Sequence, residues 1–163
     1  MKNKKLILIY FFSISILFSA CGFKPLYKMS EDGSNIGNYS IKLINEVSRE
    51  IEEEVKSNLI ESTDPEYLVL VEIKEDQIPL IINTNGTVAK YRVEIVMSFE
   101  IIKIADNKTL SKGTSRGFAQ YDVGESEINN ENTKTRMAKN ATKSAIQIMI
   151  SKIQSSISRD NDN

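Results

Sequence analysis

The stretch that decides the fold is "TVAKYRVEIVMSFEIIKI", residues 87 to 104, because its side chains alternate in character along its length. The apolar set is Ala89, Tyr91, Val93, Ile95, Met97, Phe99 and Ile101, and the polar set is Lys90, Arg92, Glu94, Ser98 and Glu100. A period of two places each set on its own face of a β-strand. We therefore predict a long strand with one face in the core and the other facing water or a partner.

Further strand patterns lie on both sides of this stretch. "NYSIKLI" (38–44) alternates in the same way, and "EYLVLVEIKED" (66–76) begins apolar on both faces, as a strand covered on both sides does. "TLSKGTSRGFAQYDV" (109–123) follows a predicted turn, "ADNK". One face of that strand carries small residues, which let a helix approach closely: Gly113, Ser115, Gly117 and Ala119.

The segment "QIPLIINTNGT" (77–87) contains Pro79 and an Asn85-Gly86 pair. Proline cannot donate to a sheet, and Asn-Gly favours a tight turn. We expect this segment to interrupt the sheet and reverse the chain.

Two segments have helical periodicity. In "NEVSREIEEEVKSNLIES" (45–62), apolar residues recur every four positions, and its glutamates, Glu50, Glu52, Glu53 and Glu54, are expected on the solvated face. The second helix is predicted at 133–158, after an acidic, Asn-rich segment, and 159–163 is expected to be a disordered tail.

The order strand, helix, three strands, helix is an α+β pattern. We predict one domain, 39–158, in which two helices pack on one face of a four-stranded sheet. A chain of 163 residues is long enough for one such core and too short for two.

The N-terminus has the composition of a secretory signal. Lys2, Lys4 and Lys5 precede an apolar run, and small residues follow it at 19–20. The run, 6–18, is shorter than the roughly 20 residues that a membrane-spanning helix needs, so a permanent transmembrane anchor is the weaker interpretation. We predict a lipoprotein signal peptide at 1–20.

Cys21 is the single cysteine, so no disulfide is possible within the chain. Its position directly after the small residues resembles the lipobox of bacterial lipoproteins, although Phe18 stands where such boxes usually carry Leu. A buried free thiol is the competing interpretation. Lipidation of Cys21 would anchor the protein to a membrane, with 21–38 as a tether and this covalent lipid as the only attached group.

Composition argues against several classes of function. The chain has 21 Lys and Arg against 22 Asp and Glu, which makes nucleic-acid binding improbable as its main activity. It has no His, so neither an enzyme nor a transition-metal site is expected.

The mature chain resembles LptE, the lipoprotein of the lipopolysaccharide transport machinery. The stretches that carry the resemblance are "CGFKPLY", "NGTVAKYRVEIVMSFEI", "SRGFAQYDVGESEINNEN" and "RMAKNATKSAIQIMISKI". The resemblance is specific because these stretches occur together and in this order. It covers essentially all of the mature chain, in the style of alphaproteobacterial members.

The resemblance implies a lipoprotein of the outer membrane that faces the periplasm. Its partner would be the outer-membrane β-barrel LptD, which it would plug and help to assemble, and it would help deliver lipopolysaccharide to the outer leaflet. Relatives bind lipopolysaccharide partly through two basic residues. The corresponding positions here are Thr84 and approximately Asn130, so direct binding would need other residues.

Residues that could bind lipopolysaccharide can also be selected from the sheet itself. The polar faces of the long strand and its hairpin partner bring Lys90, Arg92, Lys112 and Arg116 to one side, where they could hold phosphate. The competing interpretation is a solvated face balanced by Glu94 and Glu100.

Candidate barrel contacts are Asn85, Gly86, Tyr121 and Asp122, with the segments 77–82 and 121–128 around them. We expect most of Ile78, Leu80, Ile81 and Ile82 to pack into the core beside Pro79. The alternative function for the whole chain is a free-standing envelope lipoprotein that binds a lipid or a cell-wall ligand.

Overall fold

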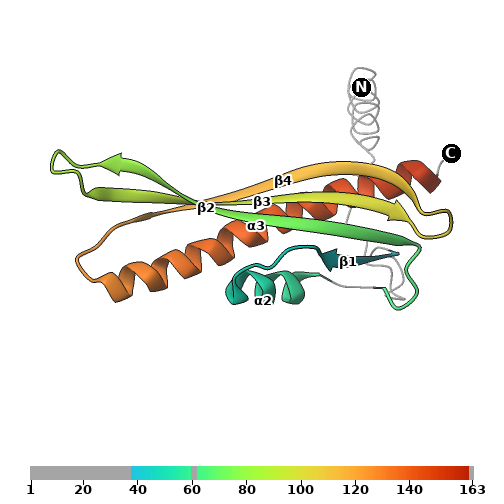
Figure 1. Cartoon of the computed structure of the whole chain (residues 1–163), viewed down its shortest axis with the longest axis horizontal. Coiled ribbons are helices and arrows are strands. Elements are labelled where there is room, and N and C mark those ends of the chain that lie inside the picture. Colours follow the sequence, from blue (N-terminus) through green and yellow to red (C-terminus); the bar gives the residue numbers. More distant parts are fainter. Residues whose placement is uncertain (1–37, 60–61, 162–163) are drawn as a thin grey trace, which may run out of the picture. The chain divides into compact units, whose positions relative to one another are not determined.

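The computed structural model describes residues 38–59 and 62–161. The predicted signal peptide, Cys21 and the tether up to residue 37 lie outside the described residues. The elements are β1 (Tyr39–Leu43), α2 (Arg49–Asn58), β2 (Tyr67–Ile82), β3 (Val88–Lys103), β4 (Lys108–Asp122) and α3 (Glu127–Asn161). Their order, β-α-β-β-β-α, confirms the α+β prediction (Figure 1).

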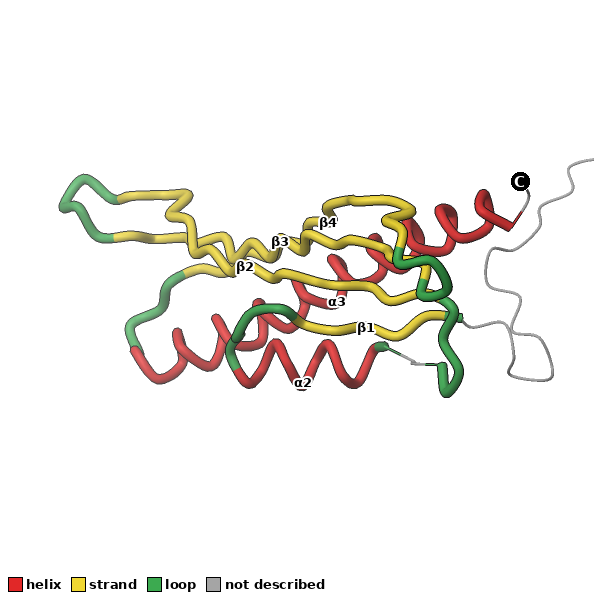
Figure 2. The backbone as a smooth tube through the Cα atoms, turned by 45° about the vertical axis from the view of Figure 1, so that its right-hand side comes forward, coloured by secondary structure: helices red, strands yellow, loops and turns green. Residues whose placement is uncertain are grey.

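The four strands form one sheet in the order β1-β2-β3-β4. β1 lies parallel to β2, whereas β2, β3 and β4 are joined by two antiparallel hairpins. Both helices lie on the same side of the sheet (Figure 2). In the part of the chain that the structure describes, no helix combines the length and the apolar character needed to cross a membrane.

The core lies between the helices and the sheet. From β3, it takes the predicted apolar set, of which Val93, Ile95, Met97, Phe99 and Ile101 are each at most 4% exposed. β2 contributes Tyr67, Val69, Val71 and Ile73, and α3 contributes Ala141, Ala145, Ile146, Met149 and Ile153. The period of two in β3 therefore identified the buried face correctly.

Gly117 in β4 is the position where α3 comes nearest to the sheet. A Cβ atom built on Gly117 would lie 1.9 Å from the carbonyl oxygen of Ala141 and 2.7 Å from the amide nitrogen of Ala145. Both atoms belong to the helix backbone, which cannot move aside as a flexible side chain can. The prediction that small residues in β4 let a helix approach closely is confirmed.

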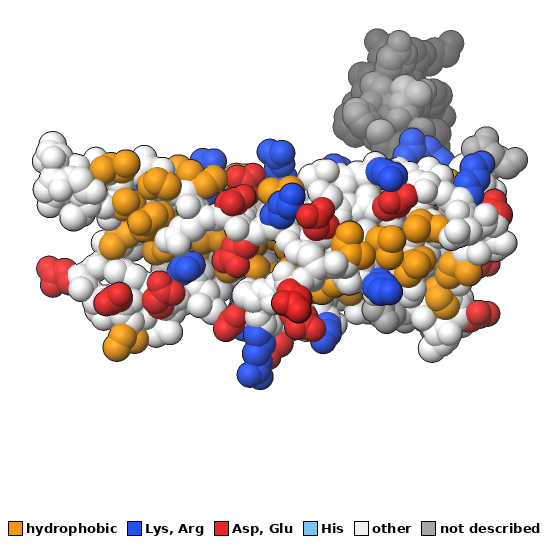
Figure 3. All heavy atoms as spheres, in the orientation of Figure 1, with side chains coloured by type: hydrophobic (Ala, Val, Ile, Leu, Met, Phe, Trp, Pro, Cys, Tyr) orange, Lys and Arg blue, Asp and Glu red, His pale blue; other side chains and the backbone are white. Residues whose placement is uncertain are grey.

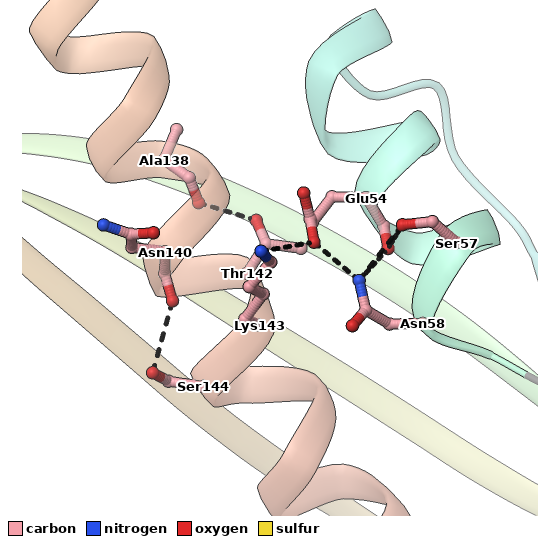
Figure 4. A network of polar contacts seen from close by, with 8 residues as sticks. All are labelled: Glu54, Ser57, Asn58, Ala138, Asn140, Thr142, Lys143 and Ser144. Carbon is pink, nitrogen blue, oxygen red and sulfur yellow. Dashed lines mark hydrogen bonds and ion pairs between the residues drawn. The ribbon is translucent and has the colours of Figure 1, made fainter.

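The two helices are joined by a polar network around Glu54 (Figure 4). The carboxylate of Glu54 pairs with Lys143 of α3 at 3.5 Å and accepts a hydrogen bond from the Asn58 side chain. Glu54 is only 9% exposed. Its assignment to the solvated face of the helix was therefore wrong, because α3 covers that side of α2.

β2 is longer than the sequence predicts. It continues through Pro79 to Ile82, with register shifts at 79–82 in place of an interruption. The ladder with β1 ends at Val71, so this part of β2 is an edge strand. An edge tolerates a residue without an N–H, which explains why Pro79 does not end the strand.

α3 begins at Glu127, six residues before its predicted start, and ends at Asn161. Ser126 caps its first turn, with the Ser126 hydroxyl accepting from the Asn129 amide at 3.4 Å. Asn130 then holds the preceding loop, since its side chain accepts from the Gly124 amide at 2.8 Å and donates to the Gly124 carbonyl at 2.9 Å. The prediction of a disordered tail from residue 159 was wrong for residues 159–161, which belong to α3.

Asp160 ties this end of α3 to the sheet. Its carboxylate accepts from the Lys103 ammonium at 2.7 Å and from the Tyr67 hydroxyl at 2.9 Å. The hydrogen bond from Lys103 lowers the pKa of Asp160, and the same bond raises the pKa of Lys103. Both groups are therefore charged at neutral pH, which explains why the last turn is ordered.

Candidate functional site

Residues 77–89, which we term the arm, form the end of the β2–β3 hairpin and extend away from α3 (Figures 1 and 2). The arm contains no charged residue. Leu80, Ile81 and Ile82 are 36%, 49% and 62% exposed. Hydrophobic side chains are visible over this end of the molecule at the left of Figure 3. The arm is thus an apolar surface that the fold leaves open.

The expectation that most of the arm's aliphatic residues pack into the core was wrong. Ile78 is half-buried, whereas Leu80, Ile81 and Ile82 are exposed. The register shifts between Pro79 and Ile82 end the regular alternation that hides the other apolar side chains of β2. The sequence shows the proline but not which way the following residues turn.

The tip of the arm is held by its own side chains. The Asn85 carboxamide oxygen accepts from the Thr87 amide at 3.1 Å and from the Thr87 hydroxyl at 2.7 Å, while the Asn83 side chain donates to that hydroxyl at 3.0 Å. Gly86 takes a φ of 86°, which glycine adopts without strain. The predicted contacts Asn85 and Gly86 therefore lie, together with Thr84, at an exposed turn that these hydrogen bonds hold.

The base of the arm packs on α3 through Tyr121. This side chain is 7% exposed and forms a small cluster with Val93 and Ala138. Its ring stacks on Tyr91 with centroids 5.7 Å apart, and its hydroxyl accepts from the Gln77 side chain at 2.7 Å. Burial raises the pKa of Tyr121. The proposed barrel contact at Tyr121 is thus a core side chain that supports the arm, whereas Asp122 beside it is exposed.

The face of the sheet opposite the helices, which we term the open face, carries the four predicted cations. In the β3–β4 register, Lys90 lies opposite Asp122, Arg92 opposite Gln120, and Lys112 opposite Glu100. The four cations share a face, as predicted. They do not form one cluster, because Lys90 and Lys112 are separated by ten residues of strand, or about 33 Å at about 3.3 Å per residue.

Three of these cations have carboxylate partners. Lys90 pairs with Asp122 at 3.2 Å, Lys112 with Glu100 at 3.0 Å, and Arg116 with Glu94 at 3.9 Å. The pKa of Glu100 is lowered, first by the hydrogen bond from the Thr109 hydroxyl and then by Lys112. Most of the open face therefore agrees with the interpretation of a balanced, solvated surface.

Arg92 differs from the other three cations. Among the described residues, no carboxylate lies within ion-pair distance of it, and its buried Nε atom has no hydrogen-bond acceptor. Its guanidinium lies over the ring of Phe118, 5.4 Å from the centroid. Phe118 itself is 63% exposed. One sign of this pair is visible in the sequence, because Phe118 is an aromatic residue on the otherwise polar face of β4.

The arrangement is suited to binding. In the described ranges, no three acidic, His or Cys side chains come together as metal ligands would. What this part of the molecule offers is an uncharged apolar arm, a guanidinium without an anionic partner and an exposed aromatic ring. These groups recognise apolar surfaces and anions.

Three solved structures of bacterial proteins share this fold. A candidate lipoprotein from Caulobacter crescentus matches with a TM-score of 0.58 and 8% identity, over 76% of this chain and 92% of that one. An uncharacterized lipoprotein B from Nitrosomonas europaea matches with a TM-score of 0.51 and 11% identity, over 74% of this chain and 83% of that one. A minor lipoprotein from Acinetobacter baumannii matches with a TM-score of 0.50 and 13% identity, over 72% of this chain and 90% of that one.

No protein-family model matches the chain, and no curated protein does either. At identities of 13% or less, the structural likenesses show a common fold. The α+β architecture predicted from the sequence is thus one that proteins described as lipoproteins adopt.

Proposed function

We propose that this protein is a lipoprotein of the outer membrane, anchored through lipid on Cys21 and facing the periplasm. It binds the β-barrel LptD as a plug and assembly partner, and it helps to deliver lipopolysaccharide to the outer leaflet. The role is not catalytic, and it requires no cofactor beyond the covalent lipid.

The observation that carries the proposal is the arm. Burying an aliphatic side chain of this size contributes roughly 1.5–3 kcal/mol, and a contiguous exposed apolar patch commonly marks an interaction site. The arm leaves three such side chains outside the core. The hydrogen bonds of Asn83, Asn85 and Thr87 hold its tip in one conformation, which reduces the entropy that a partner must overcome.

The arm favours a protein partner over the hydrocarbon of a bilayer. Beyond Ile73, no strand among the described residues pairs with the outer edge of β2, so N–H and C=O groups of that edge lie open. Open sheet edges are too costly to expose to lipid tails. The inside of a barrel or its loops can supply hydrogen bonds as well as apolar contact.

Two further observations support the proposal. The sequence resembles LptE over essentially the whole mature chain, and proteins described as lipoproteins have the same fold. The apolar run at 6–18, followed by Cys21, is typical of a lipidated leader.

The experiment is co-purification after detergent extraction of the full-length protein. We expect a stoichiometric complex with a large β-barrel, and accumulation of lipopolysaccharide in the inner envelope when the protein is depleted. A lipoprotein that purifies alone, with normal lipopolysaccharide transport after depletion, would support a free-standing envelope lipoprotein instead.

The arm variant Ile81→Ser/Ile82→Ser sharpens this experiment. We expect the variant to lose most of the barrel from the complex, because its contact surface is no longer apolar. Ile104→Ser/Ile148→Ser is the matched control, since these residues are also exposed, at 49% and 42%, but lie outside the arm. Equal recovery of the barrel with both variants would exclude the arm as the contact.

A further inference from the structure

The outer edge of β1 carries backbone groups that the described residues leave without a partner. At the end of the strand, the Ile44 amide donates to the Val71 carbonyl at 3.0 Å, so Ile44 faces β2. Because successive peptide groups of a strand point to opposite sides, those of Ile41 and Leu43 point to the outer edge. No described residue pairs with them on that side. Two residues of this edge can therefore hydrogen-bond to another extended chain.

The first residue of β1 shows the same direction. The Tyr39 carbonyl, two residues before Ile41, accepts from the Ser62 amide at 3.2 Å. Ser62 belongs to the chain that follows α2. A backbone amide is thus already hydrogen-bonded to the outer edge at its beginning. Within the described residues, this pairing does not continue to Ile41 or Leu43.

A groove of about 610 Å³ lies beside the open part of this edge, between β1 and α2 (Figure 2). Its walls are Ile41, Lys42 and Leu43 of β1 and Glu52, Val55, Lys56 and Leu59 of α2. Its volume is within the range of roughly 300–1,000 Å³ that is usual for ligand pockets. Ile41, Leu43 and Leu59 are only partly buried, although they pack against the core. The groove therefore offers apolar contact along an edge that offers hydrogen bonds.

An open edge strand beside a helix is a geometry that binds extended peptides. Main-chain hydrogen bonds along the edge provide affinity, and pockets for every second side chain provide specificity. A strand added to β1 would turn alternate side chains toward Ile41, Leu43 and α2. A hydrocarbon chain in the same groove would cover the peptide groups of the edge without pairing with them, which is costly. The groove therefore fits a polypeptide better than a hydrocarbon.

The charge on the other side of β1 indicates which polypeptide fits. Lys42 is exposed, and none of the described carboxylates pairs with it. In the β1–β2 register it lies opposite Leu70. Lys56, by contrast, already pairs with Glu52 at 2.6 Å. Opposite charges on neighbouring strands attract, so the segment that fits has apolar residues at every second position and an acidic residue between them.

We propose that the edge of β1 and the groove beside α2 bind an extended segment of another protein by strand addition. Ile41 and Leu43 supply the backbone hydrogen bonds, and Lys42 pairs with an acidic side chain of the segment. This surface is separate from the arm, because β1 pairs with β2 only as far as Val71. The distance along β2 from there to residue 77 is about 20 Å, at about 3.3 Å per residue. Binding here is thus independent of the contact proposed for the arm.

The test is direct binding of synthetic peptides to the full-length lipoprotein in lipid nanodiscs. The first probe is a short acetylated and amidated peptide in which valine alternates with serine and one serine is replaced by glutamate. The second is the same peptide with N-methylated backbone amides, and the third has lysine in place of the glutamate. We expect the N-methylated peptide to bind at least about tenfold more weakly than the first, because it cannot donate hydrogen bonds to the edge. Hydrogen exchange of the Ile41 and Leu43 amides should slow when the first peptide binds.

Charge reversal at Lys42 tests the predicted pair. We expect Lys42→Glu to weaken binding of the glutamate peptide about fivefold and to strengthen binding of the lysine peptide by a similar factor. Lys108→Glu is the matched control, since Lys108 is also exposed and has no ion pair among the described residues. It should change the affinity for either peptide less than twofold. Because both lysines are exposed, both variants should fold, which urea unfolding checks.

Three results would overturn the proposal. Equal binding of the N-methylated and unmodified peptides would make the groove an apolar surface that accepts any hydrophobic chain. Equal effects of Lys42→Glu and Lys108→Glu would replace the specific pair with general electrostatic attraction. If the glutamate peptide does not bind, strand addition by such a segment is excluded, and self-association in analytical ultracentrifugation would then assign the edge to a second copy of this chain. The barrel is absent from these measurements, so none of these results bears on the proposed function.

Discussion

β2 and β3 have two different environments along their length. Over the helix-covered part, the apolar residues that face α3 are almost completely buried, and the helix backbone comes within contact of Gly117. In the arm, the same two strands expose Leu80, Ile81 and Ile82 and have no charged residue. The difference shows that one hairpin can pack its apolar residues into the core along one part of its length and expose apolar residues to solvent along another.

The largest expected effect is at the covered part. Gly117→Val places carbon atoms where the backbone of Ala141 and Ala145 already lies, so α3 must move away from the sheet. We expect a loss of about 3 kcal/mol or more in the free energy of unfolding, measured by urea denaturation. A loss below about 1 kcal/mol would mean that the backbone of α3 does not pack closely against Gly117.

Asp160→Asn tests the other end of the covered part. At pH 7 we expect a clear loss of stability, smaller than that of Gly117→Val, because Lys103 loses its carboxylate partner. The pKa of Asp160 is lowered in the folded state, so its stabilisation is present above the usual value of 3.8 and is lost as the pH falls through the folded pKa.

The difference in the free energy of unfolding between wild type and Asp160→Asn should therefore become smaller as the pH is lowered from neutral into the acid range. Asp64→Asn is the control, since Asp64 is exposed and its carboxylate makes no ion pair or hydrogen bond among the described residues. A gap that stays constant with pH would exclude the charged pair as its cause.

Gly86→Ala probes the tip of the arm. The residue has a φ of 86°, with nothing within 4 Å of an added Cβ atom. Steric crowding is therefore absent, and the cost is that of the left-handed backbone alone, about 1 kcal/mol. Unfolding by urea should show this loss. A loss as large as that of Gly117→Val would show that the arm is packed as tightly as the covered part.

Ile81→Ser/Ile82→Ser should have the smallest effect on stability. Because both side chains are exposed, we expect a change within about 0.5 kcal/mol in the free energy of unfolding. Thermal or urea unfolding measures it. A loss of several kcal/mol would place these isoleucines in the core, as the sequence had suggested, and would remove the argument for a contact surface.

The strands and the buried face could be predicted from the sequence because they depend on local alternation. The pattern around Val93 and Ile95 determines which side of β3 is apolar, whatever the rest of the chain does. The small face of β4 at Gly117 likewise indicated where a helix would pack. Such features follow from the period of a strand and need no knowledge of distant partners.

The features that could not be predicted depend on contacts between distant residues. Glu54 is buried because α3 covers it, and Asp160 is ordered because Lys103 and Tyr67 reach it across the sheet. The register shifts after Pro79 decide that Ile81 and Ile82 face outward. None of these results can be read from neighbouring residues in the chain.

The candidate site was predicted in part for the same reason. The common face of Lys90, Arg92, Lys112 and Arg116 follows from alternation, and the register confirms it. Which of these cations has a partner depends on the residues opposite, on the neighbouring strand. The sequence alone could not single out Arg92.

The measurement that tests the central claim most directly is photo-crosslinking in intact cells, with a photoreactive residue placed at Ile82 in the arm and, separately, at Ile148 on α3. Both positions are exposed, so reactivity differs only through the partner that each one meets. The account predicts that the residue at Ile82 captures a large β-barrel protein of the outer membrane and that the residue at Ile148 captures much less of it. Equal capture at the two positions, or none at Ile82, would contradict the claim that the arm is the surface that meets the barrel.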